Sequence, residues 1–507
     1  MANPSPDAAL DRGPVLIAVV LAAVKLVIHL ALAGRYGFNG DELYFIACGR
    51  HLAFGYVDHA PLVPWIARAS IALLGGHLFA LRIPSALAGA SAIVLTVLIV
   101  REWGGGAFAQ LLAGLSMLIP PAYLRMGSIL CIPVFEPVYW TTCAYLIVRI
   151  LRDHRPRLWL LVGVVAGVGL LNKHTMLFFC LAVLVGLLAT SPRQLLSRWL
   201  WLGALAAALI FLPNLLWQHR HGWPTVEFIH NIGEDQLKAI PRSLFLLGQV
   251  LYMHPFTLPI TFAGLWFFYS PAGASYRIFG WIFLVVLGLL LVTHGKPYYL
   301  APAYPPLFAG GAVWFERQIL STRWRRVVLG VCVLGGVMLA PFSLPVLPLP
   351  VTDQLIGRVL GGIVRPSDLT LELHEQYGWP EQAEAVARAY RALPDEQKRA
   401  ASILTHDYTQ ASAINFFGPA QGLPRAVSGH MTYWLWGPEP DRGRTVLAYG
   451  FPDSALRRWF SDVDAVGTIS HPLASEWQTG LPIYLCTQPR MPLVQAWPEM
   501  KRYRFRD

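Results

Sequence analysis

Long hydrophobic runs alternate with short polar stretches from residue 14 to residue 346. Most of the runs approach the length of about 20 residues that an α-helix needs to cross the hydrocarbon core of a bilayer. The pattern therefore predicts a polytopic α-helical membrane protein. About eleven spans are predicted, at residues 14–34, 78–100, 107–121, 130–151, 158–172, 174–190, 199–217, 243–268, 278–294, 298–315 and 327–346.

The pattern changes near residue 349, where the chain becomes polar with mixed charges. An amphipathic helix is predicted at 377–393, a helical segment at 453–460, and strands at 401–404, 445–451, 463–469 and 481–487. We therefore divide the chain into a transmembrane domain, residues 1–348, with a first outer loop at 35–77, and a soluble α/β domain, residues 349–507. The second domain carries no dinucleotide-binding or P-loop motif, so packing or acceptor docking is its expected role.

The composition supports a membrane protein and narrows its partners. Of the 507 residues, 55% are hydrophobic and only 14% are charged, with a mean hydropathy of +0.48, whereas a soluble protein has roughly 25% charged residues. The net charge is +11, but no basic tract is interleaved with aromatic residues in a polar segment, so nucleic acid is not an expected partner. Four of the six cysteines fall within predicted spans, and a structural disulfide is not expected.

Lysine and arginine residues gather in alternate turns, at 101–106, 152–157, 191–198, 270–277 and 316–326. Cationic turns stay in the cytoplasm. With eleven spans, this predicts a cytoplasmic N-terminus and a periplasmic or equivalent extracytoplasmic position for the C-terminal domain, in a cell (inner) membrane. The residues suited to chemistry then lie on the outer side.

The first outer loop holds two acidic sites among apolar and aromatic neighbours. Asp41 and Glu42 are adjacent, and Asp58-His59 follows in the same loop. Carboxylates in such surroundings cost several kcal/mol unless a cation, a metal ion or a hydrogen-bonded ligand matches them. A carboxylate beside an imidazole suits a divalent ion and a phosphate equally well, so the residues leave this choice open.

Cationic and aromatic residues near the ends of later spans could bind a lipid-linked phosphate. They are Arg125, Lys173 and Lys296, with Tyr298 and Tyr299 beside the last. A lysine with two tyrosines supplies both charge and hydroxyl donors to a phosphate. Anchoring at the membrane interface explains the same residues equally well.

Three motifs carry a resemblance to a known family: Asp41-Glu42-Leu43-Tyr44, the stretch from Gly55 to Leu62, and Lys296-Pro297-Tyr298-Tyr299-Leu300. With them, residues 39–311 resemble the GT-C membrane glycosyltransferases that use a polyprenyl-phosphate sugar. The nearest branch is the dolichyl-phosphate-mannose protein mannosyltransferase superfamily, which includes the lipid A aminoarabinose transferases. The chain departs from that pattern at His59-Ala60, which leaves metal or phosphate contact at this place unsettled.

The resemblance implies a reaction and roles for the residues. Asp41 corresponds to the essential first-loop acid, with Glu42 completing the pair, and a carboxylate there suits a general base that accepts a proton from the attacking hydroxyl. The departing polyprenyl phosphate needs cations already in place, for which Lys173, Lys296, His59 and Arg125 are the candidates. Direct displacement predicts inversion at the anomeric carbon. No cofactor is certain; Glu42 and Asp58 are the candidate ligands of a divalent metal ion.

The expected function is transfer of a sugar from a polyprenyl-phosphate donor to an unknown extracytoplasmic acceptor, a cell-envelope glycan, lipid or protein, with membrane lipid as the other partner. The alternative is a transporter or flippase of a lipid-linked saccharide, because both activities need a polar site that reaches the bilayer. Against it, the spans show no obvious internal repeat of the kind that many transporters have.

Overall fold

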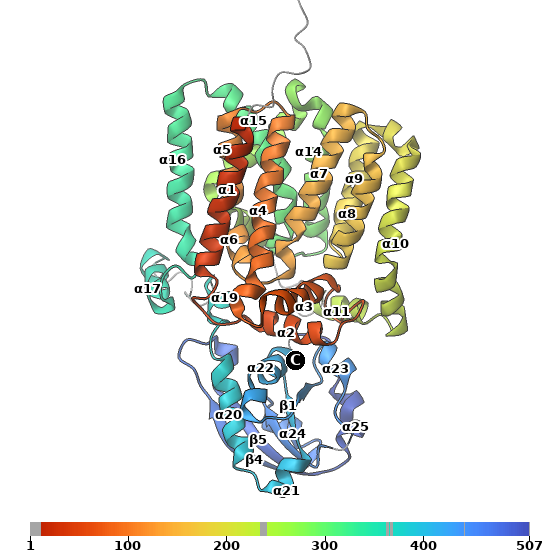
Figure 1. The fold of residues 1–507 in the computed structure, drawn as a ribbon, viewed down its shortest axis with the longest axis vertical. Coiled ribbons are helices and arrows are strands. Elements are labelled where there is room, and N and C mark those ends of the chain that lie inside the picture. Colours follow the sequence, from red (N-terminus) through yellow and green to blue (C-terminus); the bar gives the residue numbers. More distant parts are fainter. Residues whose placement is uncertain (1–11, 234–240, 361–364, 366–368, 441, 506–507) are drawn as a thin grey trace, which may run out of the picture.

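The structure is a computed structural model that describes residues 12–233, 241–360, 365, 369–440 and 442–505. The predicted cytoplasmic N-terminus falls within residues 1–11 and so lies outside the described residues. The apolar runs form a bundle of helices that stand side by side (Figure 1). Its helices are α1 (Arg12–Leu32), α4 (Leu78–Glu102), α5 (Ala107–Leu118), α6 (Pro121–Ser128), α7 (Glu136–Asp153), α8 (Leu158–Asn172), α9 (Met176–Thr190), α10 (Arg198–Arg220), α12 (Arg242–Met253), α13 (Leu258–Tyr269), α14 (Ile278–Val292), α15 (Tyr304–Gln318) and α16 (Thr322–Leu339).

Among the described residues, four helical segments are long and apolar enough to cross a membrane. They are Leu78–Glu102, Ile132–Asp153, Arg198–Arg220 and Thr322–Phe342, and two bent pairs would raise the number to six. Five further apolar helices, among them α8, α9 and α14, are shorter. The helical membrane class is confirmed by the bundle, whereas the number of eleven spans stays a prediction.

Prolines break some of the predicted spans. The span predicted at 243–268 is bent, because the helices α12 and α13 meet at 92° around Pro255. The span predicted at 107–121 likewise ends at Pro120, where α5 and α6 meet at 60°. A proline has no N–H to donate and its ring displaces the preceding turn, so each of these helices bends there.

The first outer loop is largely helical, which the sequence analysis did not predict. It contains α2 (Gly40–Arg50) and α3 (Leu62–Leu74), which lie across the lower end of the bundle together with α11 (Pro224–Ile232) (Figure 1). The helix α2 begins at a capping box, in which the Asn39 side chain accepts from the backbone of Asp41 at 3.0 Å and Glu42 accepts from the backbone N–H of Asn39 at 2.9 Å. This cap fixes the directions in which the two acids point.

The C-terminal segment contains a five-stranded sheet with the order β2-β1-β3-β5-β4. The strands β1 (Ala401–Thr405), β2 (Ala426–Ser428) and β3 (Thr445–Tyr449) are parallel, whereas β4 (Phe460–Ile469) and β5 (Leu481–Pro489) pair in the antiparallel sense. Every residue of β1 and β3 is buried, as in a sheet covered on both faces. The predicted C-terminal sheet is therefore confirmed, while the domain boundary at 349 stays a prediction.

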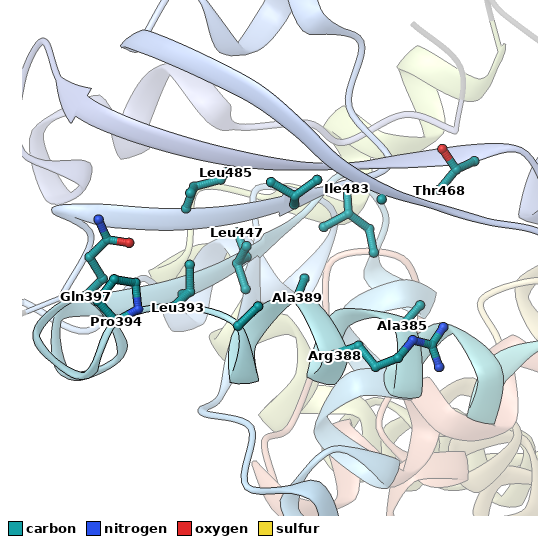
Figure 2. A pocket seen from close by; sticks show the side chains of 13 residues that line it. Ala385, Arg388, Ala389, Leu393, Pro394, Gln397, Leu447, Thr468, Ile483 and Leu485 are labelled. Atoms are coloured by element: carbon teal, nitrogen blue, oxygen red, sulfur yellow. The ribbon is translucent and has the colours of Figure 1, made fainter.

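Helices flank this sheet, and they match the sequence prediction only in part. The predicted amphipathic helix is α20 (Trp379–Arg391), whereas the helix predicted at 453–460 is only α24 (Asp453–Leu456), because β4 begins at Phe460. The helix α22 (Tyr408–Phe417) was not predicted. The remaining helices of this segment are α17 (Leu349–Leu360), α19 (Leu371–His374), α21 (Asp395–Ala400), α23 (Thr432–Trp436) and α25 (Leu493–Ala496). Between α20 and the sheet lies a cavity of about 360 Å³, lined by Arg388, Leu447 and Ile483 among others (Figure 2).

The C-terminal segment packs directly on the first outer loop. A Cβ atom added to Gly40 would lie 2.9 Å from the Trp379 ring and 3.0 Å from Thr409, so α2 fits closely against α20 and α22. Tyr44 of α2 shares a buried hydrophobic cluster with Tyr408 and Tyr433. The helix that carries Asp41 is therefore covered by the bundle on one side and by the C-terminal segment on the other.

Candidate active site

Asp41 lies in the first turn of α2, and its residue is exposed although the next eight residues of the helix are buried. The hydroxyl of Tyr408 donates to Oδ1 of Asp41 at 2.8 Å. Crowding by the surrounding protein raises the pKa of Asp41 to about 6, and the negative charges of Asp58 and Asp407 add to this, while the Tyr408 hydrogen bond and His59 oppose it. A carboxylate of this kind is accessible, mostly ionised at neutral pH and able to accept a proton.

Glu42 faces the opposite way and is fully buried. Arg82 donates to both of its oxygens, from Nε at 2.9 Å and from Nη2 at 2.8 Å, and the backbone N–H groups of Asn39 and Leu130 donate at 2.9 and 2.8 Å. A buried carboxylate matched in this way joins α2, α4 and the segment after α6. The catalytic or metal-binding role of Glu42 stays a prediction, and its acceptor positions are occupied in the structure.

Arg82 was not identified as a candidate from the sequence, although a signal was present. It is a lone arginine within the apolar run 78–100, and its side chain is 2% exposed. An ionisable group within such a run generally has a charged partner inside the protein. The buried ion pair with Arg82 therefore gives Glu42 a structural role beside Asp41.

Asp58 and His59 lie beside the same helix. The Tyr44 hydroxyl donates to Oδ1 of Asp58 at 2.8 Å, and His59 Nε2 is 4.0 Å from the same oxygen. The other ring nitrogen of His59 is 2.9 Å from the Ala60 carbonyl, and the rings of Tyr44 and Tyr56 enclose the imidazole. The fold therefore brings Asp58 and His59 into the electrostatic neighbourhood of Asp41.

A divalent metal ion was a further prediction for this loop. Over the part of the chain that the structure describes, no group of three or more His, Cys, Asp or Glu side chains is arranged to hold a metal ion. Asp58 accepts a hydrogen bond from Tyr44, and the Glu42 carboxylate is taken up by Arg82. A metal ion would therefore need oxygen ligands from the substrate phosphate or from water, and metal dependence stays a prediction.

Lys173 and the two tyrosines, which are distant in sequence, come together in the fold. Nζ of Lys173 is 2.9 Å from Glu136 Oε2, 3.8 Å from the centre of the Tyr299 ring and 5.7 Å from that of Tyr298. Thr175 donates to the other oxygen of Glu136. Lys173 is thus a cation held in place at the bundle end by an acid and an aromatic face.

Arg125 and Lys296 differ in how firmly they are held. Arg125 on α6 donates to the carbonyls of Leu369 at 2.6 Å and Phe342 at 3.2 Å, and its Nε is 3.5 Å from Glu372. Lys296, at the start of the turn before α15, is partly buried, and its side chain makes no hydrogen bond or ion pair with any described residue. Lys296 is the freer of the two cations.

Cys131, which follows α6, is close enough to two of the predicted acids and to one of the predicted cations to feel their charges. Cys131 lies within electrostatic range of Asp41, Glu42 and Glu372, and it also interacts with Lys173. His174, next to Lys173, is likewise within range of His59. The acid of the first loop and the cation after α8 therefore belong to one neighbourhood.

The C-terminal segment contributes an acid that the sequence analysis missed. Trp477 donates to Glu375 at 3.1 Å. Burial raises the pKa of Glu375 to about 8, and the charges of Glu372 and Asp41 act in the same direction. Glu375 belongs to a polar, mixed-charge stretch, so nothing in the sequence distinguishes it from a solvated surface acid.

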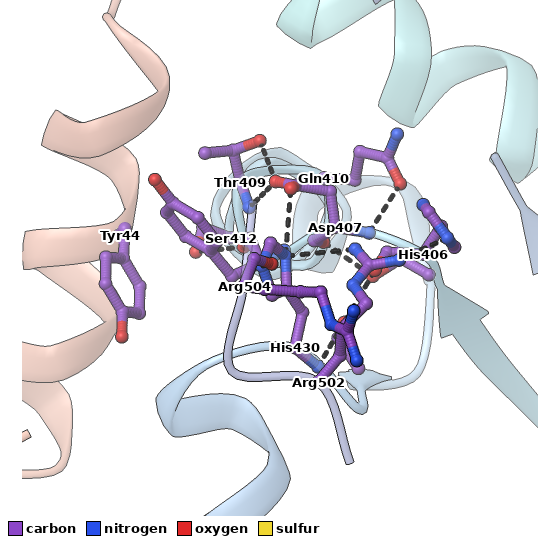
Figure 3. Close-up of polar contacts among 12 residues, drawn as sticks. Tyr44, His406, Asp407, Thr409, Gln410, Ser412, His430, Arg502 and Arg504 are labelled. Carbon is purple, nitrogen blue, oxygen red and sulfur yellow. Dashed lines mark hydrogen bonds and ion pairs between the residues drawn. The ribbon is translucent and has the colours of Figure 1, made fainter. Parts of the chain in front are cut away.

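Tyr408 is positioned by a buried ion pair (Figure 3). His430 Nδ1 lies 2.9 Å from Asp407 Oδ2, and the backbone of Thr409 donates to the other oxygen at 2.7 Å, which caps α22. Burial alone would raise the pKa of Asp407, but the charge and hydrogen bond of His430 and the bonds from Thr409 hold it below its ordinary value. Asp407 thereby fixes the start of α22, where Tyr408 reaches Asp41.

This architecture, a helix bundle with a helical first loop and a C-terminal segment packed on that loop, is similar to the fold of GT-C membrane glycosyltransferases. The family model described as dolichyl-phosphate-mannose-protein mannosyltransferase matches residues 58–217. The chain is 24% identical over 344 residues to the lipid A galacturonosyltransferase RgtD of Rhizobium johnstonii, which covers 64% of this chain and 70% of that protein.

Solved structures show the same fold. ArnT from Cupriavidus metallidurans bound to undecaprenyl phosphate aligns with a TM-score of 0.62 and 18% identity over 92% of this chain and 97% of that one. The arabinofuranosyltransferase AftD from Mycobacteria aligns with a TM-score of 0.52 and 13% identity over 97% of this chain and 41% of that one. The predicted resemblance to GT-C enzymes is thus confirmed at the level of the fold, and the relatives that the chain matches are glycosyltransferases. The transporter or flippase alternative has no support among these relatives.

Proposed function

We propose that this protein transfers a sugar from a polyprenyl-phosphate donor to a lipid acceptor on the extracytoplasmic face of the cell membrane. The donor class is supported by the ArnT structure, which holds undecaprenyl phosphate. The acceptor class is supported by RgtD, which acts on lipid A. Lipid A is therefore the first acceptor to test.

The single observation that carries the proposal is the state of Asp41. The residue is exposed, its carboxylate accepts a hydrogen bond from Tyr408 at 2.8 Å and has a pKa raised to about 6, whereas the adjacent Glu42 is buried against Arg82. A general base works best when its pKa lies near the operating pH. The fold thus separates a carboxylate available for chemistry from one used for structure.

The reaction assigns the remaining residues. Asp41 accepts the proton of the acceptor hydroxyl as that oxygen attacks the anomeric carbon, and the bond from this carbon to the phosphate oxygen breaks. In this reaction Lys173, Lys296, Arg125 and His59 are the cations proposed to stabilise the negative charge that develops on the departing phosphate. Displacement from the opposite face inverts the configuration at the anomeric carbon.

The orientation in the membrane belongs to the same proposal. Figure 1 shows α10 and α16 running toward the C-terminal segment, so their basic starting ends, at Arg198 and Arg323, lie at the far end of the bundle. Placing those ends in the cytoplasm follows the preference of cationic turns and puts Asp41 outside. Labelling single cysteines at the two ends from one side of sealed vesicles would test this orientation.

The activity is tested with the purified full chain in detergent, given a labelled undecaprenyl-phosphate sugar and lipid A. We expect labelled lipid A to form without any membrane gradient, with inverted configuration at the anomeric carbon. The Arg152→Gln variant, altered at the far end of the bundle, should form it at the same rate. Absence of product with every donor sugar offered, from protein that is folded and monodisperse, would contradict the proposal.

A further inference from the structure

A basic cavity lies at the opposite end of α2 from Asp41. Arg50 ends the helix, His51 follows it, and Arg425 comes from the C-terminal segment; with Trp436 they line a cavity of about 230 Å³. Arg50 lies nine positions after Asp41, which places the two residues about 14 Å apart along the helix axis. No described aspartate or glutamate lines this cavity.

Among the described residues, no aspartate or glutamate forms an ion pair with the two arginines of this cavity. Arg50 donates to the carbonyl of Asn415 at 3.1 Å. Nη2 of Arg425 is buried and has no hydrogen-bond partner among the described residues. Burial lowers the pKa of His51, and the charges of Arg425 and Arg50 lower it further. Because arginine stays protonated and buried donors are nearly always satisfied, the arrangement suits an anion.

The surface beside the cavity indicates where that anion comes from. Leu52 and Phe54, immediately after His51, are 57% and 50% exposed. Exposed apolar side chains next to cations are typical of a segment that lies at the level of lipid headgroups. An arginine fork binds phosphate oxygens in pairs, so a lipid-borne phosphate matches both features.

We propose that Arg50, His51 and Arg425 bind a phosphate group of the acceptor lipid. The proposal rests on the transferase function above and gives its acceptor a chemical class, a phosphorylated glycolipid. The helix α2 then carries the acceptor site at both ends, with the phosphate at Arg50 and the reacting hydroxyl near Asp41.

Binding is measured first, because it needs no turnover. The purified full chain is titrated with lipid A and with enzymatically dephosphorylated lipid A, with folding checked by gel filtration. We expect the wild-type protein to bind the phosphorylated form at least about tenfold more tightly, and Arg425→Gln to lose this preference; tenfold corresponds to 1.4 kcal/mol. Equal affinity of the wild-type protein for both lipids, or an unchanged preference in Arg425→Gln, would overturn the proposal.

Two further substitutions make this result specific. Arg444→Gln removes the same charge from an exposed position of the C-terminal segment outside the cavity, and it should keep the full preference. Arg425→Lys keeps the charge but loses the fork, so it should retain part of the preference. Arg50→Gln, at an exposed position, gives the same test if Arg425→Gln does not fold.

Competition separates the sources of phosphate. Inorganic phosphate and mixed micelles of phosphatidylglycerol should each displace lipid A only weakly, because neither offers a phosphate joined to an acceptor sugar. Displacement by phosphatidylglycerol as effective as that by unlabelled lipid A would overturn the acceptor assignment in favour of a general headgroup site. Equally effective displacement by inorganic phosphate would overturn it in favour of a free-phosphate site.

Turnover distinguishes this proposal from the function on which it rests. In Arg425→Gln we expect the KM for lipid A to rise about tenfold with kcat and the donor KM unchanged. Transfer without any dependence on the acceptor phosphate would leave the transferase standing and reject the cavity. Phosphate-dependent binding of lipid A without transfer would support the phosphate site and reject the transferase function.

Discussion

The two ends of the helix bundle use charge in different ways. At the far end, Arg149 and Arg152 pair with Asp153 at 2.6 and 2.7 Å in the last turns of α7, and both also pair with Glu102 at the end of α4. At the other end, Asp41 meets Tyr408 and Glu42 meets Arg82, partners that lie far away in sequence. Ion pairs that stay partly exposed to solvent contribute little to stability, and a basic turn suits orientation in the membrane.

The acids at the two ends of the bundle also differ in the direction in which their pKa values are shifted. Asp41 and Glu375 have pKa values raised to about 6 and about 8 by their surroundings, whereas the pKa of Asp153 lies near 2 because Arg152 and Arg149 stabilise its charge. Perturbed acids that distant segments bring together are candidates for function. The comparison can be broken by changing one matched residue at each end.

The largest effect is expected from Glu42→Gln. The substitution leaves Arg82 buried with a neutral partner, and breaking a buried ion pair costs about 3 to 5 kcal/mol. We expect a large fall in the unfolding temperature in detergent, with loss of transfer as a consequence. Asp153→Asn, at the far end, should change the unfolding temperature far less. Equal effects of the two substitutions would contradict the structural role of Glu42.

The next effect concerns the donor. Lys173→Gln should raise the KM for the polyprenyl-phosphate sugar about tenfold, equivalent to 1.4 kcal/mol, while the acceptor KM stays unchanged. Because the change leaves Glu136 unpaired, the double variant Lys173→Gln/Glu136→Gln serves as a control for folding and should show the same donor defect. Steady-state kinetics with varied donor, compared with Arg152→Gln, measures this. An unchanged donor KM would remove Lys173 from the phosphate site.

The smallest effect is expected from Tyr408→Phe. Transfer by the wild-type protein should fall below about pH 6, where Asp41 becomes protonated and loses its capacity as a base. The Tyr408 hydrogen bond stabilises the charged carboxylate, so its loss raises the pKa of Asp41 and moves the acid limb to higher pH. The pH profile of kcat/KM measures the shift, and Tyr390→Phe is a matched control. An acid limb that does not move would contradict the contact's role.

Much of the fold could be predicted from local patterns. Apolar runs predicted most of the bundle helices, and short runs of residues that favour strands predicted β1, β3, β4 and β5. The bends at Pro120 and Pro255 were signalled by the prolines, but their size of 60° and 92° depends on packing in the bundle. The helix α2 was missed because its buried residues are divided between the bundle and the C-terminal segment, which obscures the helical period. The helix α3 was missed because its 13 residues are too few to cross a membrane.

The site could be predicted only for residues with an unusual local setting. Asp41, Asp58 and Lys173 stand out as charges among apolar neighbours. Tyr408 and Glu375 belong to an ordinary polar stretch, and only the docking of the C-terminal segment on α2 brings them to Asp41. The different uses of Asp41 and Glu42 depend likewise on Arg82, 40 residues beyond Glu42.

The measurement that tests the central claim most directly is transfer from a labelled undecaprenyl-phosphate sugar by purified wild-type protein and by Asp41→Asn. The account predicts that the variant folds and binds the donor as the wild-type protein does but transfers at least about 100-fold more slowly, the lower range for loss of a general base. Wild-type rates in a folded Asp41→Asn protein would show that the proton goes elsewhere and would contradict the account.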